Sequence, residues 1–268
     1  MDRYDGIFRR KSVRSYSTAP LGDDVLRKIK TSLDCRVPLF PELNTEVKML
    51  HWADMEGAIK GILPGVNKIR SPHYLVVCSR EEKGDMENVG YSMERVVLDL
   101  TRWGVGTCWM GAGFRMNEVE RVADVGEDMR VVILVAFGEA EGESPWRDPG
   151  DFKRRPLSEL MLNGKPPKGE WLNILEAARM APSAINLQPW RFHLGHGGVH
   201  LYISNKGGVL ERTLKRFTIV GELNRIDAGI ALSHLDIAAE HFGKEIRFEY
   251  AEAREFPGHQ YVISILEK

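Results

Sequence analysis

Apolar residues recur at helical and strand-like spacings along the whole chain and predict a mixed α and β protein. The longest helical pattern in the first half runs from Met86 to Trp103 and places Glu94 and Arg95 away from its apolar face. Dense apolar runs between polar turns predict buried strands. Further helices are expected at residues 5–10, 25–33, 118–123, 170–180 and 221–242, and strands at 45–52, 74–78, 130–138, 191–194 and 261–266.

The order of these elements repeats in the two halves of the chain. Each half starts with a basic cluster, continues with a helix, has a long helix that ends at a glycine, and closes with an apolar strand. Leu98-Asp99-Leu100 even matches Leu235-Asp236-Ile237 locally. Residues 142–150, with two prolines, are the best linker candidate. We therefore expect two similar modules, 1–150 and 151–268, packed about a pseudo-twofold axis.

Composition narrows the possible function classes. The 268 residues carry 37 basic and 38 acidic side chains, so no nucleic-acid or anionic-membrane partner is indicated. The longest apolar run, at 131–137, is too short to span a bilayer, and the N-terminus has no apolar signal core. Three widely spaced cysteines without a Cys-x-x-Cys pair favour a reducing cytoplasm over a disulfide framework or a zinc site.

A basic segment near the N-terminus is the first candidate for ligand binding. Arg9, Arg10, Lys11 and Arg14 lie within six residues and enclose the hydroxyl of Ser12. Guanidinium groups match phosphate oxygens in two-point contacts, so the segment can bind a phosphate. The alternative is a solvated basic helix end, because cations are favourable near the C-terminal dipole of a helix.

A glycine-rich segment, residues 104–113, follows the predicted helix at 86–103. Its four glycines allow the backbone to approach a ligand closely, or only to bend between a helix and a strand. The spacing does not match the Gly-x-Gly-x-x-Gly dinucleotide motif. Cys108 is interpreted as a core residue, because no basic residue adjoins it in the sequence.

A third candidate is the connector at residues 181–192, after a helix that Pro182 should end. Ser183, Asn186 and Gln188 offer donors and acceptors to the edge of a flat ring, and Trp190 offers an aromatic wall. A capped turn with an ordinary core tryptophan is the alternative.

The three candidate segments resemble signatures of the FMN-dependent nitroreductase family. The chain has Arg-x-Ser-x-Arg-x-Tyr at 10–16, Gly-x-Gly-Thr-Cys-Trp at 104–109 and Pro-Ser-x-x-Asn-x-Gln-Pro-Trp at 182–190. A basic-Pro-Leu-x-Glu-Leu run at 155–160 is similar to the end of many family subunits. The resemblance implies an α+β, nitroreductase-like fold, in which a flavin is shared between two subunits.

The resemblance also implies which residues contact FMN. Arg10 and Ser12 would contact the region of the ribityl phosphate, and Arg14 would lie near the pyrimidine side of the ring. Residues 110–112 would run past the ring, and residues 182–188, called the ring loop below, would supply its other wall. The full expected set is Arg10, Lys11, Ser12, Arg14, Met110, Gly111, Ala112, Arg154, Arg155, Pro182, Ser183, Ala184, Asn186 and Gln188.

The two halves depart from the family pattern in complementary ways. The first half has no ring loop after its first long amphipathic helix, where residues 34–41 stand instead. The second half has Arg155-Pro156-Leu157-Ser158 in place of the spaced cations. A second site would therefore pair 38–41 with 155–158, without the groups that bind flavin. We expect an intrachain pseudo-dimer of two α/β modules with one complete flavin site, monomeric unless chains associate further.

The function implied by the resemblance is reduction of small electrophilic acceptors, such as nitroaromatics or quinones, by NAD(P)H through bound FMN. No Ser-His-Asp, Cys-His or paired-carboxylate site is recognised, which fits a cofactor that carries the hydride chemistry. No catalytic side chain or metal ligand is therefore assigned. Two alternatives remain open: another flavin reaction such as dehalogenation or flavin fragmentation, and a degenerate copy that binds a small molecule or partner without turnover.

Overall fold

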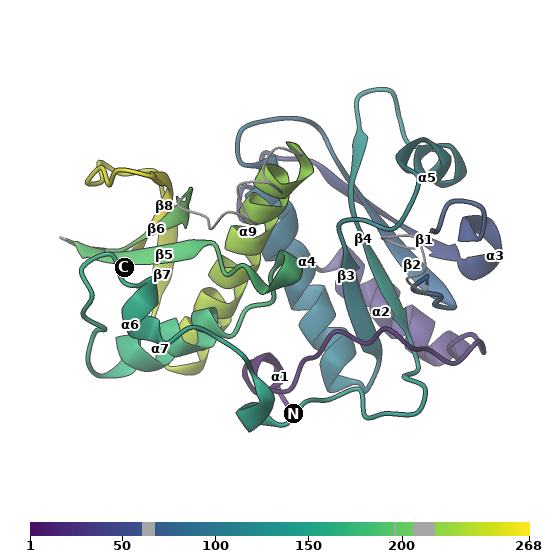
Figure 1. Cartoon of the computed structure of the whole chain (residues 1–268), viewed down its shortest axis with the longest axis horizontal. Helices are drawn as coiled ribbons and strands as arrows, with labels where there is room; N and C mark the ends of the chain where they lie inside the picture. Colours follow the sequence, from purple (N-terminus) through teal and green to yellow (C-terminus); the bar gives the residue numbers. More distant parts are fainter. Residues whose placement is uncertain (61–67, 196, 206–217) are drawn as a thin grey trace.

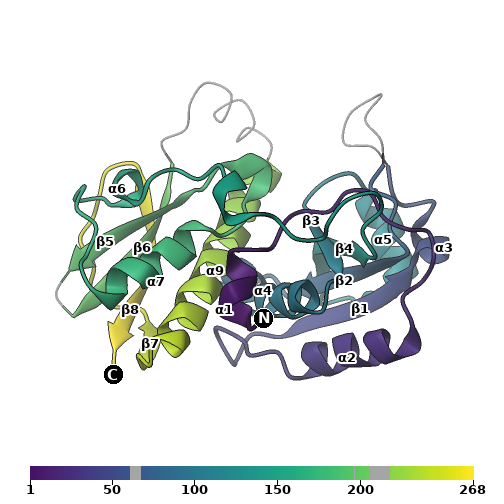
Figure 2. The same cartoon turned by 90° about the horizontal axis from the view of Figure 1, so that it is seen from below.

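Two antiparallel sheets stand on either side of a central pair of helices in the computed structural model, which describes residues 1–60, 68–195, 197–205 and 218–268 (Figure 1). The central helices are α4 (Asp85–Arg102) and α9 (Thr218–His241), which pack side by side along most of their lengths (Figures 1 and 2). The sequence predicted both helices, within three residues at each end. Each half of the chain thus contributes one sheet and one central helix.

The first sheet has the strand order β1-β2-β4-β3. Its strands are β1 (Thr45–His51), β2 (His73–Ser79), β3 (Gly106–Met110) and β4 (Arg130–Gly138). Alternate residues of β2 belong to two different cores, because successive side chains point to opposite faces of a strand. One core includes α4 and α2 (Asp23–Asp34), and the other includes α3 (Trp52–Met55) and α5 (Met116–Ala123).

The second sheet repeats this arrangement with the order β5-β6-β8-β7. Its strands are β5 (Trp190–Gly195), β6 (Gly198–Ser204), β7 (Ile246–Glu249) and β8 (His259–Glu267). Helices α6 (Leu157–Leu160) and α9 pack against it, and α7 (Glu170–Arg179) packs against α9. Both sheets also have a register shift in the second strand, between Val77 and Cys78 and between Leu201 and Tyr202. The two halves therefore share strand order and one irregularity.

Helix α4 is buried on all sides, which the sequence did not predict. Every residue from Asp85 to Thr101 is buried, including Glu94 and Arg95, which were expected on faces away from the core. The expectation was wrong because α9 packs against the polar face of α4 while the first sheet covers the apolar face. Some polar side chains of α4 have partners on α9, where Arg95 pairs with Asp236 and Glu87 pairs with Arg225.

The N-terminal segment joins both halves and leads to the candidate site. The predicted helix at 5–10 is wrong in its bounds, because α1 spans Arg3–Ile7 and is capped by Asp2. Arg3 forms an ion pair with Asp99 of α4 at 2.8 Å. Beyond the helix, Ser12 forms a parallel bridge to Thr107, which lays residues 12–14 along β3.

Most strands lie where the sequence placed them, and β4 matches its prediction at both ends. Strands β3, β6 and β7 were not predicted as strands. Residues 199–204 and 246–249 do alternate between apolar and more polar side chains, so a strand signal was available for β6 and β7. Among the described helices, none is both long and apolar enough to cross a bilayer.

Candidate functional site

A cavity of about 260 Å³ lies where the two halves meet, and three segments distant in sequence line it. The segments are the N-terminal strip with Ser12 and Arg14, the end of β3, and the ring loop; α9 closes the cavity from the side. Eight of the residues expected from the sequence line it together: Ser12, Arg14, Met110, Gly111, Ala112, Pro182, Ser183 and Ala184. The other six do not line it.

The end of β3 forms one wall of the cavity, and its residues are closely packed. A Cβ atom at Gly111 would lie 2.6 Å from a Leu223 side-chain carbon, so a larger residue here would require the Leu223 side chain to move. Cys108 lines the same wall and is 2% exposed. Burial raises the pKa of its thiol, although Arg14 and Arg10 act in the opposite direction. The thiol therefore stays protonated, in agreement with its interpretation as a core residue.

The ring loop has an unusual backbone. Ile185, Asn186 and Gln188 have φ angles of 44°, 60° and 51°, the left-handed region that residues other than glycine seldom adopt. Each such residue costs on the order of 1–3 kcal/mol unless its surroundings hold it. Ser183 Oγ accepts a hydrogen bond from the Gln188 amide at 2.9 Å, and this bond closes the loop. Strain of this kind is typical of ligand-binding loops.

Four expected residues hold one another in place beside the cavity. The Arg154 guanidinium donates to Asn186 Oδ1 at 2.8 Å, and the Arg155 backbone amide donates to Gln188 Oε1 at 2.8 Å. Asn186 Nδ2 also donates to the Lys153 carbonyl at 2.9 Å. The basic segment at 153–155 therefore braces the ring loop of its own half.

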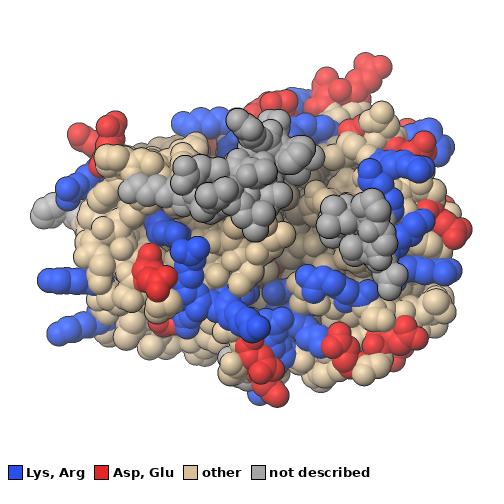
Figure 3. Space-filling view, in the orientation of Figure 1, with Lys and Arg blue, Asp and Glu red and all other residues tan. Residues whose placement is uncertain are grey.

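Arginine side chains gather next to the cavity and raise the positive potential there. Figure 3 shows Lys and Arg side chains near the middle of this face, between the two halves. Burial, together with repulsion from Arg10, Arg147 and Arg179, lowers the pKa of Arg154 to about 10. Arg147 was not recognised from the sequence. It approaches Arg10 because its amide donates to the Arg9 carbonyl, and no motif signals that contact.

Arg10 is the most deeply buried member of this cluster. It is 3% exposed, and burial lowers its pKa, while Glu94 acts in the opposite direction. The nearest carboxylate contact, from Arg10 Nε to Glu94 Oε1, measures 3.8 Å. Its Nη1 is buried without a hydrogen-bond partner among the residues that the structure describes. A buried guanidinium with a free donor suits an anionic ligand group such as a phosphate.

Glu94 connects this arginine to both central helices. It accepts hydrogen bonds from Trp109 Nε1 at 2.9 Å, and its Oε1 lies 3.0 Å from His234 Nε2. Glu94 is fully buried and is compensated by three neighbours, so it can hold Arg10 in position. Lys11 behaves differently, because its ammonium pairs with Glu143 at 2.8 Å, away from the cavity.

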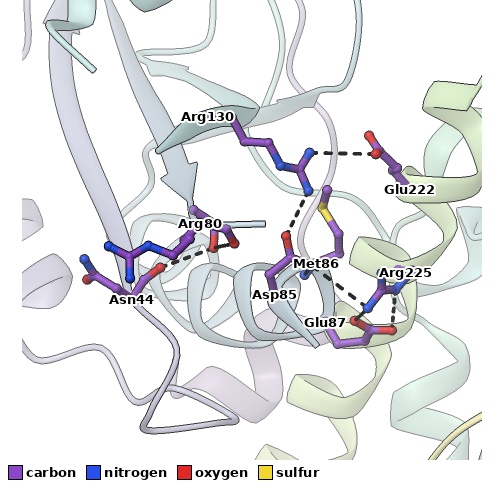
Figure 4. Close-up of polar contacts among 9 residues, drawn as sticks. Asn44, Arg80, Asp85, Met86, Glu87, Arg130, Glu222 and Arg225 are labelled. Carbon is purple, nitrogen blue, oxygen red and sulfur yellow. Dashed lines mark hydrogen bonds and ion pairs between the residues drawn. The ribbon is translucent and has the colours of Figure 1, made fainter. Parts of the chain in front are cut away.

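A second crevice, of about 650 Å³, lies between the N-terminal end of α4, the N-terminal part of α9 and strand β8. Figure 4 shows that its charged groups pair with one another. Arg225 makes two contacts of 2.8 Å with Glu87, and Arg130 lies 2.9 Å from Asp85. At its edge the ring of Tyr250 stacks on Phe40 of the segment 38–41, with ring centroids 5.7 Å apart. Among the described residues, only the first cavity combines the N-terminal strip, the end of β3 and a strained loop, which is the arrangement expected to bind a flavin.

The residues at the first cavity fit a flavin mononucleotide. The free donor of Arg10 and its arginine neighbours suit the phosphate, and the cavity suits a flat ring. Arg154 and Arg10 would hold the phosphate arm, while Ser12, Arg14 and the ring loop would contact the ring and its edge. Met110 to Ala112 would lie along the ring because glycine keeps that wall thin.

Comparisons with known proteins show the family of the chain. A family model described as "Putative TM nitroreductase" matches residues 2–239. A Thermotoga maritima structure described as a "putative nitroreductase" is similar, with a TM-score of 0.61 and 21% identity over 99% of this chain and 94% of that chain. A Bacteroides fragilis nitroreductase with bound FMN covers 53% of this chain and 91% of its own, with a TM-score of 0.44 and 18% identity. No protein of curated function matches the sequence significantly.

Proposed function

The chain belongs to the nitroreductase family, and we propose that it is an FMN-dependent oxidoreductase that uses NAD(P)H to reduce small electrophilic acceptors such as nitroaromatics or quinones. One observation carries the proposal: a strained, polar loop and a glycine-thinned strand end enclose a cavity beside buried arginines with a free donor. A flavin needs these three features, namely a phosphate anchor, polar partners for its edge and an open face.

Both halves of the chain contribute side chains that bind the FMN. Arg10 and Arg154 neutralise the phosphate, with Arg147 adding charge nearby, and Arg14 places a cation at the cavity. The bound FMN supplies hydride transfer, and a fixed cation beside its ring favours the reduced, negatively charged form. Ser183 and Ala184 present the polar edge of the ring loop to the cavity.

Part of the cavity lining is aliphatic. Ile69, Ile185 and Leu223 line it, and Ile185 is 68% exposed at the mouth. Aliphatic walls bind flat, uncharged molecules by excluding water from both partners. This lining supports nitroaromatic or quinone rings as acceptors over strongly charged ones.

The two halves also support an internal pseudo-dimer. The same strand order and the same strand irregularity recur in both sheets, and α4 and α9 take corresponding central places. We propose that modules 1–150 and 151–268 stand in for the two subunits of a family dimer. The chain would then bind one FMN and act as a monomer.

The test is the visible spectrum of the purified protein with added FMN, followed by anaerobic addition of NADH or NADPH. The proposal expects a bound flavin spectrum, its bleaching by NADH or NADPH, and its return when a quinone or a nitroaromatic is added. A protein that takes up no FMN would overturn the proposal. A flavin-loaded protein that neither nucleotide reduces would leave only the other flavin reactions.

A further inference from the structure

One carboxyl group lines the same cavity and has no role in holding the flavin. Asp227 of α9 is 5% exposed, and its side chain contributes to the cavity wall. Its two oxygens lie 3.2 and 3.0 Å from the Ala184 amide of the ring loop and accept from it. No other partner of the carboxyl is found among the residues that the structure describes.

The lack of a cation sets Asp227 apart from the other buried carboxylates. Asp99 faces Arg3 and Arg102, and Glu94 faces Arg10 and His234. Asp227 has only an amide, and an isolated carboxylate in a dry site is costly, so the neutral acid is favoured. Burial accordingly raises the pKa of Asp227 well above its ordinary value, and the Ala184 hydrogen bond opposes this only in part.

A neutral carboxyl has a donor, and the structure leaves that donor facing the cavity. The acid needs an acceptor for its O–H, while the Ala184 amide can only donate to it. The other titratable groups that line the cavity are Arg14, which cannot accept a hydrogen bond, and the protonated Cys108. The position of Asp227 in the cavity wall therefore directs the O–H toward whatever occupies the cavity.

Holding the ring loop does not by itself require an acid. In the other half of the chain, Asn88 of α4 accepts a hydrogen bond from the Phe40 amide at 3.0 Å. Phe40 follows α2 as Ala184 follows α7, so the two helices hold corresponding loops in the same way. In the first half, the side-chain amide of Asn88 is therefore sufficient to hold the corresponding loop. The loop contact alone therefore does not account for an acid at Asp227.

We propose that the Asp227 carboxyl donates the second proton to the acceptor during its reduction. This inference rests on the proposed function. The acceptor receives a hydride that originates in NAD(P)H, which is two electrons and one proton, and NAD(P)H becomes NAD(P)⁺. A quinone then carries a negative oxygen, which forms an O–H bond to the proton as the Asp227 O–H bond breaks. The resulting carboxylate regains a proton from water before the next turnover.

The experiment compares the wild type with the variant Asp227→Asn, loaded with FMN, in separate half-reactions. Asparagine can still accept from Ala184, as Asn88 does from Phe40, but it cannot transfer a proton. General acid catalysis contributes roughly 10²–10⁴-fold, so oxidation of the reduced variant by a water-soluble benzoquinone should slow by about 10²-fold or more. Oxidation by ferricyanide, which takes single electrons and no proton, should keep the wild-type rate.

A matched control variant and an infrared measurement of the protonation of Asp227 complete the test. Asp236→Asn makes the same chemical change on the same helix, at a carboxylate that pairs with Tyr91 and Arg95 outside the cavity. It should leave both oxidation rates unchanged. In flavin-free protein at neutral pH, infrared spectra should show the carbonyl band of a protonated acid in the wild type and lose it in Asp227→Asn.

Each result decides a different point. A wild type that takes up no FMN removes the proposed function, and the proton donation with it. If the wild type turns over but Asp227→Asn oxidises with benzoquinone at the same rate, the inference alone is overturned. Equal slowing with benzoquinone and ferricyanide, or no protonated-acid band, would reduce Asp227 to a support for the loop. If Asp227→Asn does not fold, Asp227→Ser is measured in the same way.

Discussion

Gly90 of α4 and Gly229 of α9 occupy reciprocal places at the crossing of the two central helices. A Cβ atom at Gly90 would overlap with the Ile226 carbonyl oxygen, and one at Gly229 would overlap with the Glu87 carbonyl oxygen. The backbones of the two helices can approach this closely only because both residues lack side chains. The contact fixes the register between the halves, and with it the distance from α9 to the end of β3.

Replacing Gly90 by alanine should therefore destabilise the whole chain. Backbone atoms cannot move aside as a flexible side chain would, and overpacking costs roughly 1–3 kcal/mol. The free energy of unfolding, measured by urea titration and circular dichroism, should fall by that amount in Gly90→Ala. The control is Gly221→Ala on the same helix as Gly229, where the added Cβ meets nothing within 4 Å. An equally stable Gly90→Ala would show that the helices can separate without cost.

The same crossing gives the proposed repeat a register that differs from the one in the local sequence match. Gly90 and Gly229 have the same sequence separation as Asn88 and Asp227, which play matching roles at their loops. The local match of Leu98-Asp99-Leu100 with Leu235-Asp236-Ile237 implies a different separation, so it aligns the helices out of register. A three-residue similarity within apolar helices arises easily by chance, whereas a backbone contact allows a single register.

The sequence could predict the site segments because each is a local motif with its own glycine, proline or clustered cations. It could not predict Arg147 or Asp227, since their roles depend on contacts across the fold. Asp227 stands in the apolar stretch Ile226–Leu232 of α9, and a lone acid in such a stretch was the available signal. Glu94 was misplaced for a related reason: periodicity identifies one apolar face, but not a second helix that buries the other.

Arg10 should be the main anchor of the cofactor phosphate. Arg10→Ala removes a charge-assisted contact worth roughly 1.5–3 kcal/mol, which corresponds to about a ten- to hundredfold loss of FMN affinity. Arg10→Lys keeps the positive charge but loses the two-point guanidinium contact, so its FMN affinity should lie between those of the wild type and Arg10→Ala. Arg121→Ala, which loses only an exposed ion pair with Glu118, is the control. An FMN dissociation constant that does not change in Arg10→Ala would remove Arg10 from the site.

Arg14 should adjust the reduction potential of the bound flavin. Its side chain lines the cavity, where a fixed cation stabilises a negatively charged reduced ring. Arg14→Gln should lower the two-electron potential by on the order of 30 mV, which corresponds to about 1.4 kcal/mol. The potential is measured by anaerobic titration against a reference dye, with Arg14→Lys as the variant that keeps the charge. Equal potentials in wild type and Arg14→Gln would place the charge too far from the ring to matter.

His73 should make the stability of the chain fall in mild acid. It is fully buried in β2, and its Nε2 accepts a hydrogen bond from the Leu21 amide at 3.0 Å. Burial, together with His51, lowers the pKa of His73 from 6.5 to about 4. Above pH 6.5 neither state holds the proton. Between pH 6.5 and 4 only the unfolded chain binds it, so stability declines over that range by up to about 3 kcal/mol.

Urea titrations at several pH values test this. The slope of stability against pH between 4 and 6.5 should be shallower in His73→Gln, which can still accept from Leu21. His241→Gln, at a half-exposed histidine, should keep the wild-type slope. Equal slopes in all three proteins would assign the acid sensitivity to other groups.

One FMN should bind per chain, although a family dimer of two such modules would hold two. At the second crevice the arginines already pair with Glu87 and Asp85, and Phe40 and Tyr250 stack at its edge. A flavin there would break those ion pairs and leave buried polar groups unpaired, at about 1–3 kcal/mol for each group. Titration of flavin-free protein, followed by flavin fluorescence, should therefore saturate at one equivalent.

The ring loop supplies the matching variant for that titration. Asn186→Ala loses the bond to Arg154 and forces alanine to a φ of 60°, so it should weaken the single site. Asn186→Gly also loses the bond but accepts the backbone angle, so it separates the contact from the strain. If Asn186→Ala binds FMN as tightly as the wild type, the ring loop does not form the wall of the site. Saturation at two equivalents in the wild type would mean that the second crevice opens to a flavin in spite of its ion pairs.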